Sequence, residues 1–411
     1  MKKLLALVLA AVMLLGMTSA FAEEEKTTLT LWCIATESDA NRPAYEKAIA
    51  AFEEANPNIK IEWEAFENDS YKTKIKSTSA EELPDIFFTW SGAFCGDFVE
   101  AGKVYCLDET FPNYAANLPE VMLQNSTYGG KHYAVPLTMN IVVMFANMDL
   151  LAEAGYDHVP TTYDELMECC AALKEKGIIP FGCSGNATWC VTEYLEPIIE
   201  KTIGYEAMGE IFAGRATWND PAIATAVDTF QKMIIDGYFD PDGLSLDNDT
   251  VKANFIAGKY AFYQNGSWNC GEINDAEGNF QAALFPVMDS EKATYGQVIG
   301  GPNDALAVSA ASKNPELAAK AAFELGKEIC HYGYLAGSGL PAWTPDYDTA
   351  EVKPLVADVA KMVAESDGMV LFGDNAMSAD PANIYLSYVA KVYGCEIDGA
   401  GFVEALTNEL Q

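Results

Sequence analysis

Hydrophobic and polar positions follow two different periods along the N-terminal part of the chain. Residues 28–34 form a β-branched and apolar run, and residues 59–64 alternate apolar with charged side chains, so both segments predict strands. Between them, residues 43–56 carry apolar side chains at i, i+4 and i+7, which predicts a helix that stops at an Asn-Pro pair. Strand, crossover helix and strand form a βαβ unit with parallel strands and a right-handed crossover.

The same alternation continues toward the C-terminus. Helical patterns cover residues 69–79, 163–176, 221–236 and 314–329. Strand-like apolar runs cover residues 84–88, 141–145, 260–263, 282–285 and 305–309. No internal repeat or low-complexity linker divides the chain, so the pattern predicts an α/β protein throughout.

The length of the chain changes this picture from one core to two. Half of its 411 residues are apolar and 21% are charged, a composition typical of globular proteins. Single hydrophobic cores stop growing near about 250–300 residues, so a chain of this length predicts two domains.

The charge balance excludes several classes of partner. The 60 Asp and Glu residues outnumber the 25 Lys and Arg residues, which gives a formal net charge of −35. Nucleic-acid binding needs clustered basic residues, so we expect no nucleic-acid partner, and anionic membrane surfaces are disfavoured for the same reason. Three scattered histidines, with no HExxH motif and no glycine-rich phosphate loop, lead us to expect no metal and no cofactor.

The first 22 residues have the pattern of a signal peptide. Two lysines precede an apolar run over residues 4–15, and residues 20–22 (AFA) form a small-residue cleavage site. This apolar run falls short of the about 20 residues that span a bilayer. We therefore expect cleavage near Ala22 and export to the periplasm or the cell surface. Removal of the two lysines takes the formal net charge of the mature chain to −37.

No membrane attachment is expected for the mature chain. The sequence LLGM at residues 14–17 is similar to a lipoprotein box, but Met17 stands where the lipidated cysteine belongs. Without that thiol no diacylglycerol can be attached. No other segment reaches 18 uninterrupted apolar residues, so we expect no direct membrane insertion.

Ten cysteines raise the question of disulfides, because exported proteins form them readily. Their spacing matches no small disulfide framework, and a domain of this size does not need one. We expect several free thiols, although Cys183 and Cys190 flank a loop and could pair. A structural zinc site would need CxxC knuckles, and the sequence has none.

Four ordered segments of the chain resemble one protein family. Residues 28–64 contain FEEANPNIKI, residues 84–86 read PDI, residues 130–178 contain YAVP, and residues 255–273 read FIAGKYAFYQNGSWNCGEI. In this order, over essentially the whole mature chain, they make the sequence similar to the extracellular solute-binding proteins of bacterial ABC importers for sugars and oligosaccharides. This is the group that includes maltose-binding proteins.

The resemblance implies a fold and a function. The fold is that of periplasmic binding proteins: two α/β lobes, each a mostly parallel sheet flanked by helices, joined by a hinge. We expect lobe one to comprise residues 23–138 plus 286–335, and lobe two residues 139–285 plus 336–411. The implied function is capture of a carbohydrate, with an oligosaccharide favoured, by hinge closure. A monomer would then deliver it to the membrane permease subunits of an ABC importer.

The binding site is expected where strands end and helices begin. Ligands of open α/β sheets bind beyond the carboxyl ends of strands, which selects residues 36–41, 89–94 and 138–140. The resemblance adds residues 186–189, 266–269 and 300–303 to the cleft.

The candidate residues follow from the chemistry of sugars, which present apolar C–H faces and a rim of hydroxyls. Their sites combine aromatic platforms with planar polar side chains. Trp268 is the first candidate for a stacking platform, because the family has a tryptophan in this motif. The other aromatic candidates are Trp90, Trp189 and Trp343. The polar and backbone candidates are Glu37, Asp39, Ser91, Asn140, Asn186, Gly301, Asn303 and Asp374.

Some of these expectations have alternatives. Asp39 is equally suited to capping the helix that follows it. Arg42 lies near the first loop, and arginine pairs bidentately with carboxylates and phosphates. An anionic ligand is therefore an alternative to a neutral sugar.

An enzyme is the alternative from another functional class. A secreted glycosidase or polysaccharide lyase needs two carboxylates at a set separation, and no motif singles out such a pair. We therefore assign no catalytic residue and expect no enzyme. A surface adhesin without an importer is a further alternative. Oligosaccharide binding without release of reducing sugar distinguishes the transport role from turnover.

Overall fold

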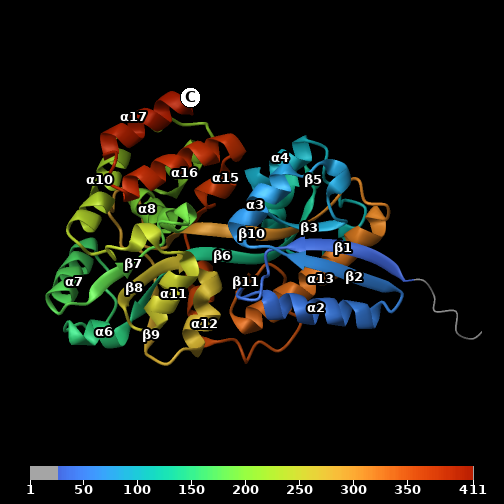
Figure 1. The fold of residues 1–411 in the computed structure, drawn as a ribbon, viewed down its shortest axis with the longest axis horizontal. Coiled ribbons are helices and arrows are strands. Elements are labelled where there is room, and N and C mark those ends of the chain that lie inside the picture. Colours follow the sequence, from blue (N-terminus) through green and yellow to red (C-terminus); the bar gives the residue numbers. More distant parts are fainter. Residues whose placement is uncertain (1–25, 411) are drawn as a thin grey trace, which may run out of the picture.

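Two lobes lie side by side in the molecule, and long strands pass from one to the other (Figure 1). The computed structural model describes residues 26–410, so the predicted signal peptide lies outside the described residues. The sheet order is β2-β1-β3-β10-β6-β8-β7, which makes one continuous sheet that serves both lobes.

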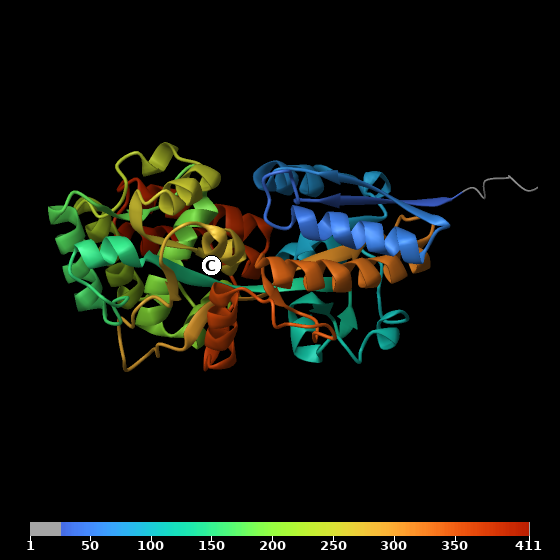
Figure 2. The ribbon, with the colours of Figure 1, turned by 90° about the horizontal axis from the view of Figure 1, so that it is seen from below.

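Lobe one is built on a parallel βαβ arrangement, as the sequence pattern predicts. Strand β1 pairs in parallel with both of its neighbours, and the helix between β1 and β2 begins with a proline in its first turn. In Figure 2 this helix, α2, lies alongside α13 under the sheet. The elements of this lobe are β1 (Thr27–Cys33), α2 (Arg42–Ala55), β2 (Ile59–Ala65), α3 (Asn68–Ser77), β3 (Ile86–Trp90), α4 (Ala93–Glu100), α5 (Glu120–Leu123), β4 (Thr127–Tyr128), β5 (Lys131–His132) and α13 (Pro315–Ala336).

Two long antiparallel strands connect the lobes. They are β6 (Ala134–Asn147), which is buried along its whole length, and β10 (Gln297–Val308), which is buried at all but one position. Near one end β10 pairs with β3 of lobe one, and beyond its midpoint β6 pairs with β8 of lobe two, both antiparallel. The sheet is therefore mixed rather than mostly parallel, with parallel pairs only at its outer strands and at β12 among the described residues.

Lobe two places helices on both sides of its part of the sheet (Figure 1). Helices α8, α10, α16 and α17 pack on one another over one face. The strands are β7 (Ile179–Gly182), β8 (Tyr260–Gly266), β9 (Phe280–Ala283) and β12 (Gly368–Val370), while β11 (Leu340–Pro341) pairs with the connecting strand β6. The helices are α6 (Met148–Glu153), α7 (Tyr163–Glu175), α8 (Thr188–Ile203), α9 (Tyr205–Phe212), α10 (Pro221–Ile235), α11 (Asn248–Ile256), α12 (Cys270–Asp275), α14 (Pro354–Ala364), α15 (Gly373–Ala376), α16 (Ala379–Tyr393) and α17 (Gly399–Glu409).

The hydrophobic cores show where the chain passes between the lobes. Val298 and Ile299, at the start of β10, pack in cores of lobe two, whereas Ala342 and Trp343 pack in the core of lobe one. The chain therefore enters lobe one later than the boundary expected at residue 286, and it leaves lobe one later than residue 335. At the first of these crossings the reason is that the uninterrupted strand β10 carries it, and no loop marks it in the sequence.

All ten cysteines are free thiols in the structure, including Cys183 and Cys190. Eight of them are buried, and burial raises the pKa of Cys33 to about 12 and that of Cys95 to about 11. These groups stay neutral near pH 7 and behave as small apolar side chains. Within residues 26–410 no cluster of His, Cys, Asp or Glu could hold a metal, and no helix there is long and apolar enough to cross a membrane.

Candidate functional site

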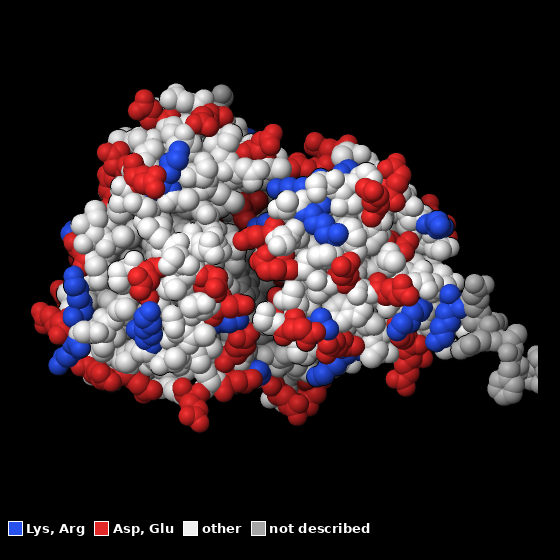
Figure 3. Space-filling view, viewed as in Figure 1, with Lys and Arg blue, Asp and Glu red and all other residues white. Residues whose placement is uncertain are grey.

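A cleft of about 490 Å³ lies where the two lobes meet, and Figure 3 shows it as a hollow between them. Lobe one supplies the loop after β1, the start of α3 and the end of β3. Lobe two supplies residues 186–193, 247–252, 268–269 and 372–375. Asn303 and Asp304 of the connecting strand β10 also line the cleft, so both lobes and the connection between them would contact one ligand.

Aromatic rings cover the lobe-two side of the cleft. The ring centroids of Trp189 and Trp268 are 6.0 Å apart with the planes inclined by 58°, and Phe372 lies 6.1 Å beyond Trp268. The indole of Trp268 folds back over Gly266, where a Cβ atom would be 2.1 Å from the ring. A glycine is therefore required at residue 266 for this ring to lie against the backbone. Both tryptophans are partly exposed, so they offer flat apolar surface to a ligand.

Trp90 lines the opposite side of the cleft from the end of β3. It is only 6% exposed, because Phe88 and Phe94 pack edge-on against it at 4.9 and 5.0 Å between ring centroids. The ammonium group of Lys72 lies 4.8 Å from its ring centre. Trp90 thus contributes a smaller apolar surface than the two tryptophans of lobe two.

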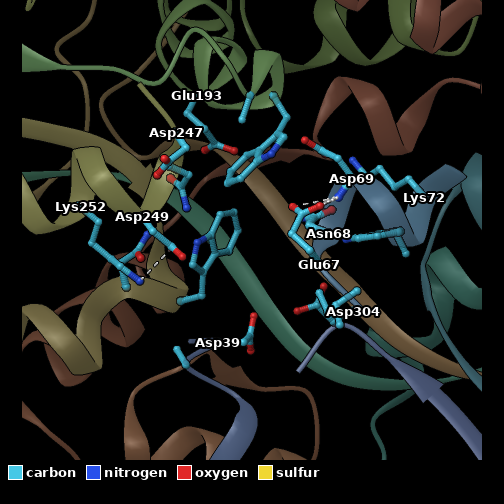
Figure 4. A pocket seen from close by; sticks show the side chains of 18 of the residues that line it. Asp39, Glu67, Asn68, Asp69, Lys72, Glu193, Asp247, Asp249, Lys252 and Asp304 are labelled. Carbon is cyan, nitrogen blue, oxygen red and sulfur yellow. Dashed lines mark hydrogen bonds and ion pairs between the residues drawn. The ribbon is translucent and has the colours of Figure 1, made fainter. Parts of the chain in front are cut away.

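Carboxyl groups converge on the cleft from both lobes, as Figure 4 shows. Lobe one and β10 supply Asp39, Glu67, Asp69 and Asp304, and lobe two supplies Glu193, Asp247, Asp249 and Asp374. Burial raises the pKa of Asp39 to about 6, although the backbone N–H of Asn41 donates to its Oδ1 at 2.8 Å. Burial raises the pKa of Asp304 to about 7, although Thr138 Oγ1 donates to its Oδ2 at 2.8 Å.

Glu193 is the most deeply buried of these carboxyl groups. Its side chain projects from α8, the residue is 3% exposed, and its Oε2 has no hydrogen-bond partner among the described residues. Burial raises its pKa well above the ordinary value, and the nearby carboxylates of Glu196 and Asp374 raise it further. A neutral carboxyl group can both donate and accept a hydrogen bond, as a sugar hydroxyl can.

Two lysines line the cleft, and each has a carboxylate partner. Lys72 Nζ lies 2.9 Å from Asp374 Oδ2, an ion pair that joins α3 of lobe one to α15 of lobe two. Lys252 Nζ lies 3.0 Å from Glu272 and 3.7 Å from Asp249. The Lys72–Asp374 pair is largely buried and holds one edge of the cleft together.

Seven of the twelve sequence candidates line the cleft. They are Asp39, Trp90, Asn186, Trp189, Trp268, Asn303 and Asp374. Asp39 combines the two roles considered for it, because its carboxyl group faces the cleft and also accepts from the backbone just before α2 (Figure 4). Whether these seven contact a ligand stays a prediction.

The other five candidates do not line the cleft. Trp343 is 3% exposed in the core of lobe one and donates its Nε1–H to the carbonyl of Pro136 at 2.8 Å. Glu37 points to solvent and pairs with Arg42. Ser91 is buried against Ser126, and Asn140 is buried under the cleft, where Ser267 Oγ donates to its Oδ1. Gly301 lies in β10, where it pairs with Asn140 of β6, and it does not line the cleft.

Arg42, the residue that suggested an anionic ligand as an alternative, does not line the cleft either. The guanidinium of Arg42 lies 2.9 Å from Glu37 and 2.7 Å from Glu46, and it stacks 4.3 Å above the ring of Trp63. It is therefore engaged on the outside of lobe one.

Sequence reasoning missed several residues that line the cleft. Residues 67–69 follow the carboxyl end of β2. Ligands bind beyond the carboxyl ends of strands, so the reasoning that selected the loops after β1 and β3 applies to these residues as well. Asp247 accepts from the backbone N–H of Thr250 and starts α11, and this N-cap pattern was visible in the sequence. Glu193 lies inside a helix, and no local pattern distinguishes it from an exposed acidic residue.

A two-lobed α/β molecule with a polar and aromatic cleft between its lobes is a protein built to enclose a small ligand. The family described as "Bacterial extracellular solute-binding protein" matches residues 36–325, and the chain belongs to this family. It is a family of binding proteins rather than enzymes, and its extracellular description implies export.

Solved structures support the same conclusion. A structure from work on xylan utilization by the thermophilic bacterium Caldanaerobius polysaccharolyticus is 32% identical, with a TM-score of 0.89 over 93% of this chain and 100% of that chain. A chitin oligosaccharide binding protein is 23% identical, with a TM-score of 0.85 over 94% of this chain and 98% of that chain. At 23% identity, the chitin oligosaccharide binding protein shows only that the two proteins share a fold.

Curated relatives match over shorter segments. A maltotriose-binding protein of Pyrococcus abyssi is 24% identical over 251 residues, which cover 60% of this chain and 51% of the relative. An ABC transporter extracellular-binding protein of Pyrococcus horikoshii is 24% identical over 237 residues, which cover 56% of this chain and 53% of the relative. The chain thus spans about half the length of these two relatives.

Proposed function

We propose that this protein captures a carbohydrate in the cleft, with an oligosaccharide favoured, and delivers it to the permease subunits of an ABC importer. The observation that carries the proposal is the composition of the cleft. Partly exposed indoles on one side face amide and carboxyl groups on the others, within about 490 Å³. This combination suits the apolar faces and the hydroxyl rim of sugar rings.

The relatives support this choice of ligand. The names of two of them refer to maltotriose and to chitin oligosaccharide, and another is named as part of an ABC transporter. We propose that the mature chain acts as a monomer outside the cytoplasm after cleavage near Ala22. We also propose that the seven candidates that line the cleft contact the sugar.

Capture requires the lobes to move, because the cleft lies between them. Contacts made by both lobes with one ligand exist only when the lobes are closed, so ligand binding favours the closed state. Periplasmic binding proteins close around their ligands by this kind of hinge motion.

The experiment is a thermal-shift and calorimetric panel with trisaccharides of xylose, glucose and N-acetylglucosamine in several linkages, beside a reducing-sugar assay. We expect at least one trisaccharide to raise the melting temperature and to bind without release of reducing sugar. Turnover of a bound glycan would overturn the transport role in favour of a glycosidase or lyase. Absence of binding across the panel would overturn the carbohydrate assignment.

A further inference from the structure

We propose that the cleft selects glycans by charge, accepting neutral sugar units and rejecting sugar units that carry a carboxylate. This inference rests on the proposed function, because it defines the substrate class of the same cleft. It follows from the charges on the cleft wall, from the partners of its cations and from one buried carboxyl group.

The wall of the cleft is strongly acidic. Eight carboxyl groups and two ammonium groups line it, and neither of the two arginines of the chain does. Figure 4 shows Asp39, Asp69, Asp304 and Asp247 placed around the cavity, so a ligand would meet acidic groups from both lobes. A carboxylate carried into the cleft would be repelled from several directions, and the low dielectric of a closed cleft strengthens this repulsion.

The cations of the cleft are already paired. A buried carboxylate is tolerated only where a positive charge and hydrogen bonds compensate it. Lys72 is paired with Asp374 across the lobes, and Lys252 is paired with Glu272 and lies 3.7 Å from Asp249, which also lines the cleft. A ligand carboxylate that approached either lysine would also meet a protein carboxylate that already neutralises the charge of that lysine.

Glu193 is a separate observation that points to a ligand with hydroxyl groups. The residue is 97% buried, lines the cleft, and leaves its Oε2 unpartnered among the described residues. The acidic groups near it are Glu196, which accepts from the backbone N–H of Gly373, and Asp374, which accepts from Lys72. A ligand hydroxyl can form a hydrogen bond with Glu193 whether Glu193 is protonated or ionised. A ligand carboxylate at this place would instead become a third acidic neighbour of Glu193, after Glu196 and Asp374.

The test compares three forms of one trisaccharide. Maltotriose, cellotriose and xylotriose are the neutral probes. The acidic probes are the two glucose trisaccharides oxidised at C6 to uronates, and xylotriose carrying methylglucuronate. The uronamides of the acidic probes have nearly the same size without the charge. The neutral, acidic and amide forms of one trisaccharide are compared at pH 7.5 and low salt. For each trisaccharide whose neutral form binds, we expect the uronate to bind about 100-fold more weakly than its uronamide. That factor corresponds to about 2.8 kcal/mol.

A variant and a salt series connect the discrimination to the cleft. Asp69→Asn removes one charge at the start of α3 and should reduce the ratio of uronate to uronamide dissociation constants by about threefold. Asp164→Asn removes a charge from the first turn of α7, does not line the cleft, and should leave the ratio unchanged. Added salt should also reduce the ratio for the native chain, because ions screen the repulsion.

The outcomes separate this inference from the proposed function. Uronate and uronamide binding within threefold of each other at low salt would overturn charge selection while carbohydrate binding stands. A ratio that Asp69→Asn and Asp164→Asn change equally would also overturn it, because the cleft would then not be its source. If no probe and no member of the wider trisaccharide panel binds, the proposed function fails and this inference fails with it.

Discussion

At the scale of single residues, Trp268 shows how one side chain is positioned for a ligand. Its ring rests on Gly266 and on neighbouring aromatic rings, while part of its surface faces the cleft. The residue is thus partly a core residue and partly a platform. Its two roles can be separated by measuring affinity and stability together.

Trp268→Ala should weaken sugar binding by about ten-fold to a few hundred-fold. The stacking contact is worth about 0.5–1.5 kcal/mol beyond area burial, and the lost apolar contact adds about 1–2 kcal/mol. Calorimetric titration gives the affinity, and the melting curve of the ligand-free variant gives the stability. Trp63→Ala is the control, because Trp63 lies in β2 outside the cleft. A large loss of stability with unchanged affinity would remove Trp268 from the binding site.

Asp304 links the stability of the protein to pH. The pKa of Asp304 is about 7 in the folded protein and near 3.8 in the unfolded chain. Between pH 4 and pH 7 the folded state therefore holds the proton of Asp304 more tightly than the unfolded state does. The free energy of unfolding therefore falls as pH rises from about 4 to about 7 and levels off above that range.

Asp304→Asn should therefore stabilise the protein at pH 8 and change little at pH 4. A full shift of this size would correspond to about 4 kcal/mol, and we expect about 1–3 kcal/mol because Asp304 is partly exposed to the cleft. Melting or urea curves of the ligand-free variant at both pH values provide the measurement. An equal effect of the substitution at pH 4 and pH 8 would show that the ionisation of Asp304 does not affect stability.

At the scale of elements, a proline inside α8 explains how this helix is tied to β8. Pro197 has no N–H, so the carbonyl of Glu193 loses its helical hydrogen bond. Gln264 of β8 replaces it by donating its Nε2–H to that carbonyl at 2.6 Å. The contact fixes the turn of α8 that brings Glu193 to the cleft.

Gln264→Leu should destabilise the protein by about 1–3 kcal/mol, because a buried carbonyl is left without a donor. Adding Pro197→Ala should recover part of this loss, since the new N–H can donate to the carbonyl of Glu193 within the helix. Denaturant curves of the two single variants and the double variant form a double-mutant cycle. Simple additivity of the two effects would contradict the proposed replacement of one donor by the other.

At the scale of the whole molecule, the cleft depends on the angle between the lobes. One continuous sheet connects them, and the Lys72–Asp374 pair joins them at the edge of the cleft. A second contact on this side is the hydrogen bond from the backbone N–H of Ala379 to Asp97, at 3.0 Å. The lobes are thus closed on this side by contacts that an open state would lose.

Small-angle scattering should give a smaller radius of gyration when a saturating sugar is present. The reason is that the ligand contacts both lobes only in the closed state, which shifts the equilibrium toward it. An unchanged radius of gyration at saturation would contradict the hinge mechanism.

Lys72→Met should shift the ligand-free protein toward the open state and raise its radius of gyration. Exposed ion pairs are worth up to about 1 kcal/mol, and this pair is largely buried, so the ratio of closed to open protein should fall by at least about fivefold. Lys60→Met is the matched control, because Lys60 pairs with Glu53 at 2.9 Å within lobe one. If both variants change the scattering equally, the interlobe pair is not what favours closure.

The sequence by itself determined several of the elements and some of the loops nearest the cleft. The period of apolar positions predicted helices α7 and α10 to within one residue of their observed ends, because local packing of one face sets that period. The family motifs indicated the two-lobed fold. Asn186, Trp189 and Trp268 lie in predicted loops and line the cleft, while their contact with ligand stays a prediction.

Only the tertiary structure decided which side chains face the cleft. Trp343 and Trp268 stand in similar Gly-rich contexts, yet one donates to the carbonyl of Pro136 inside lobe one and the other borders the cavity. The charge balance of the cleft was equally hidden, because Glu193 and Asp374 are 181 residues apart in the sequence and meet only when lobe two folds. Local sequence sets the period and ends of each element, whereas exposure to a cleft depends on how distant elements pack against one another.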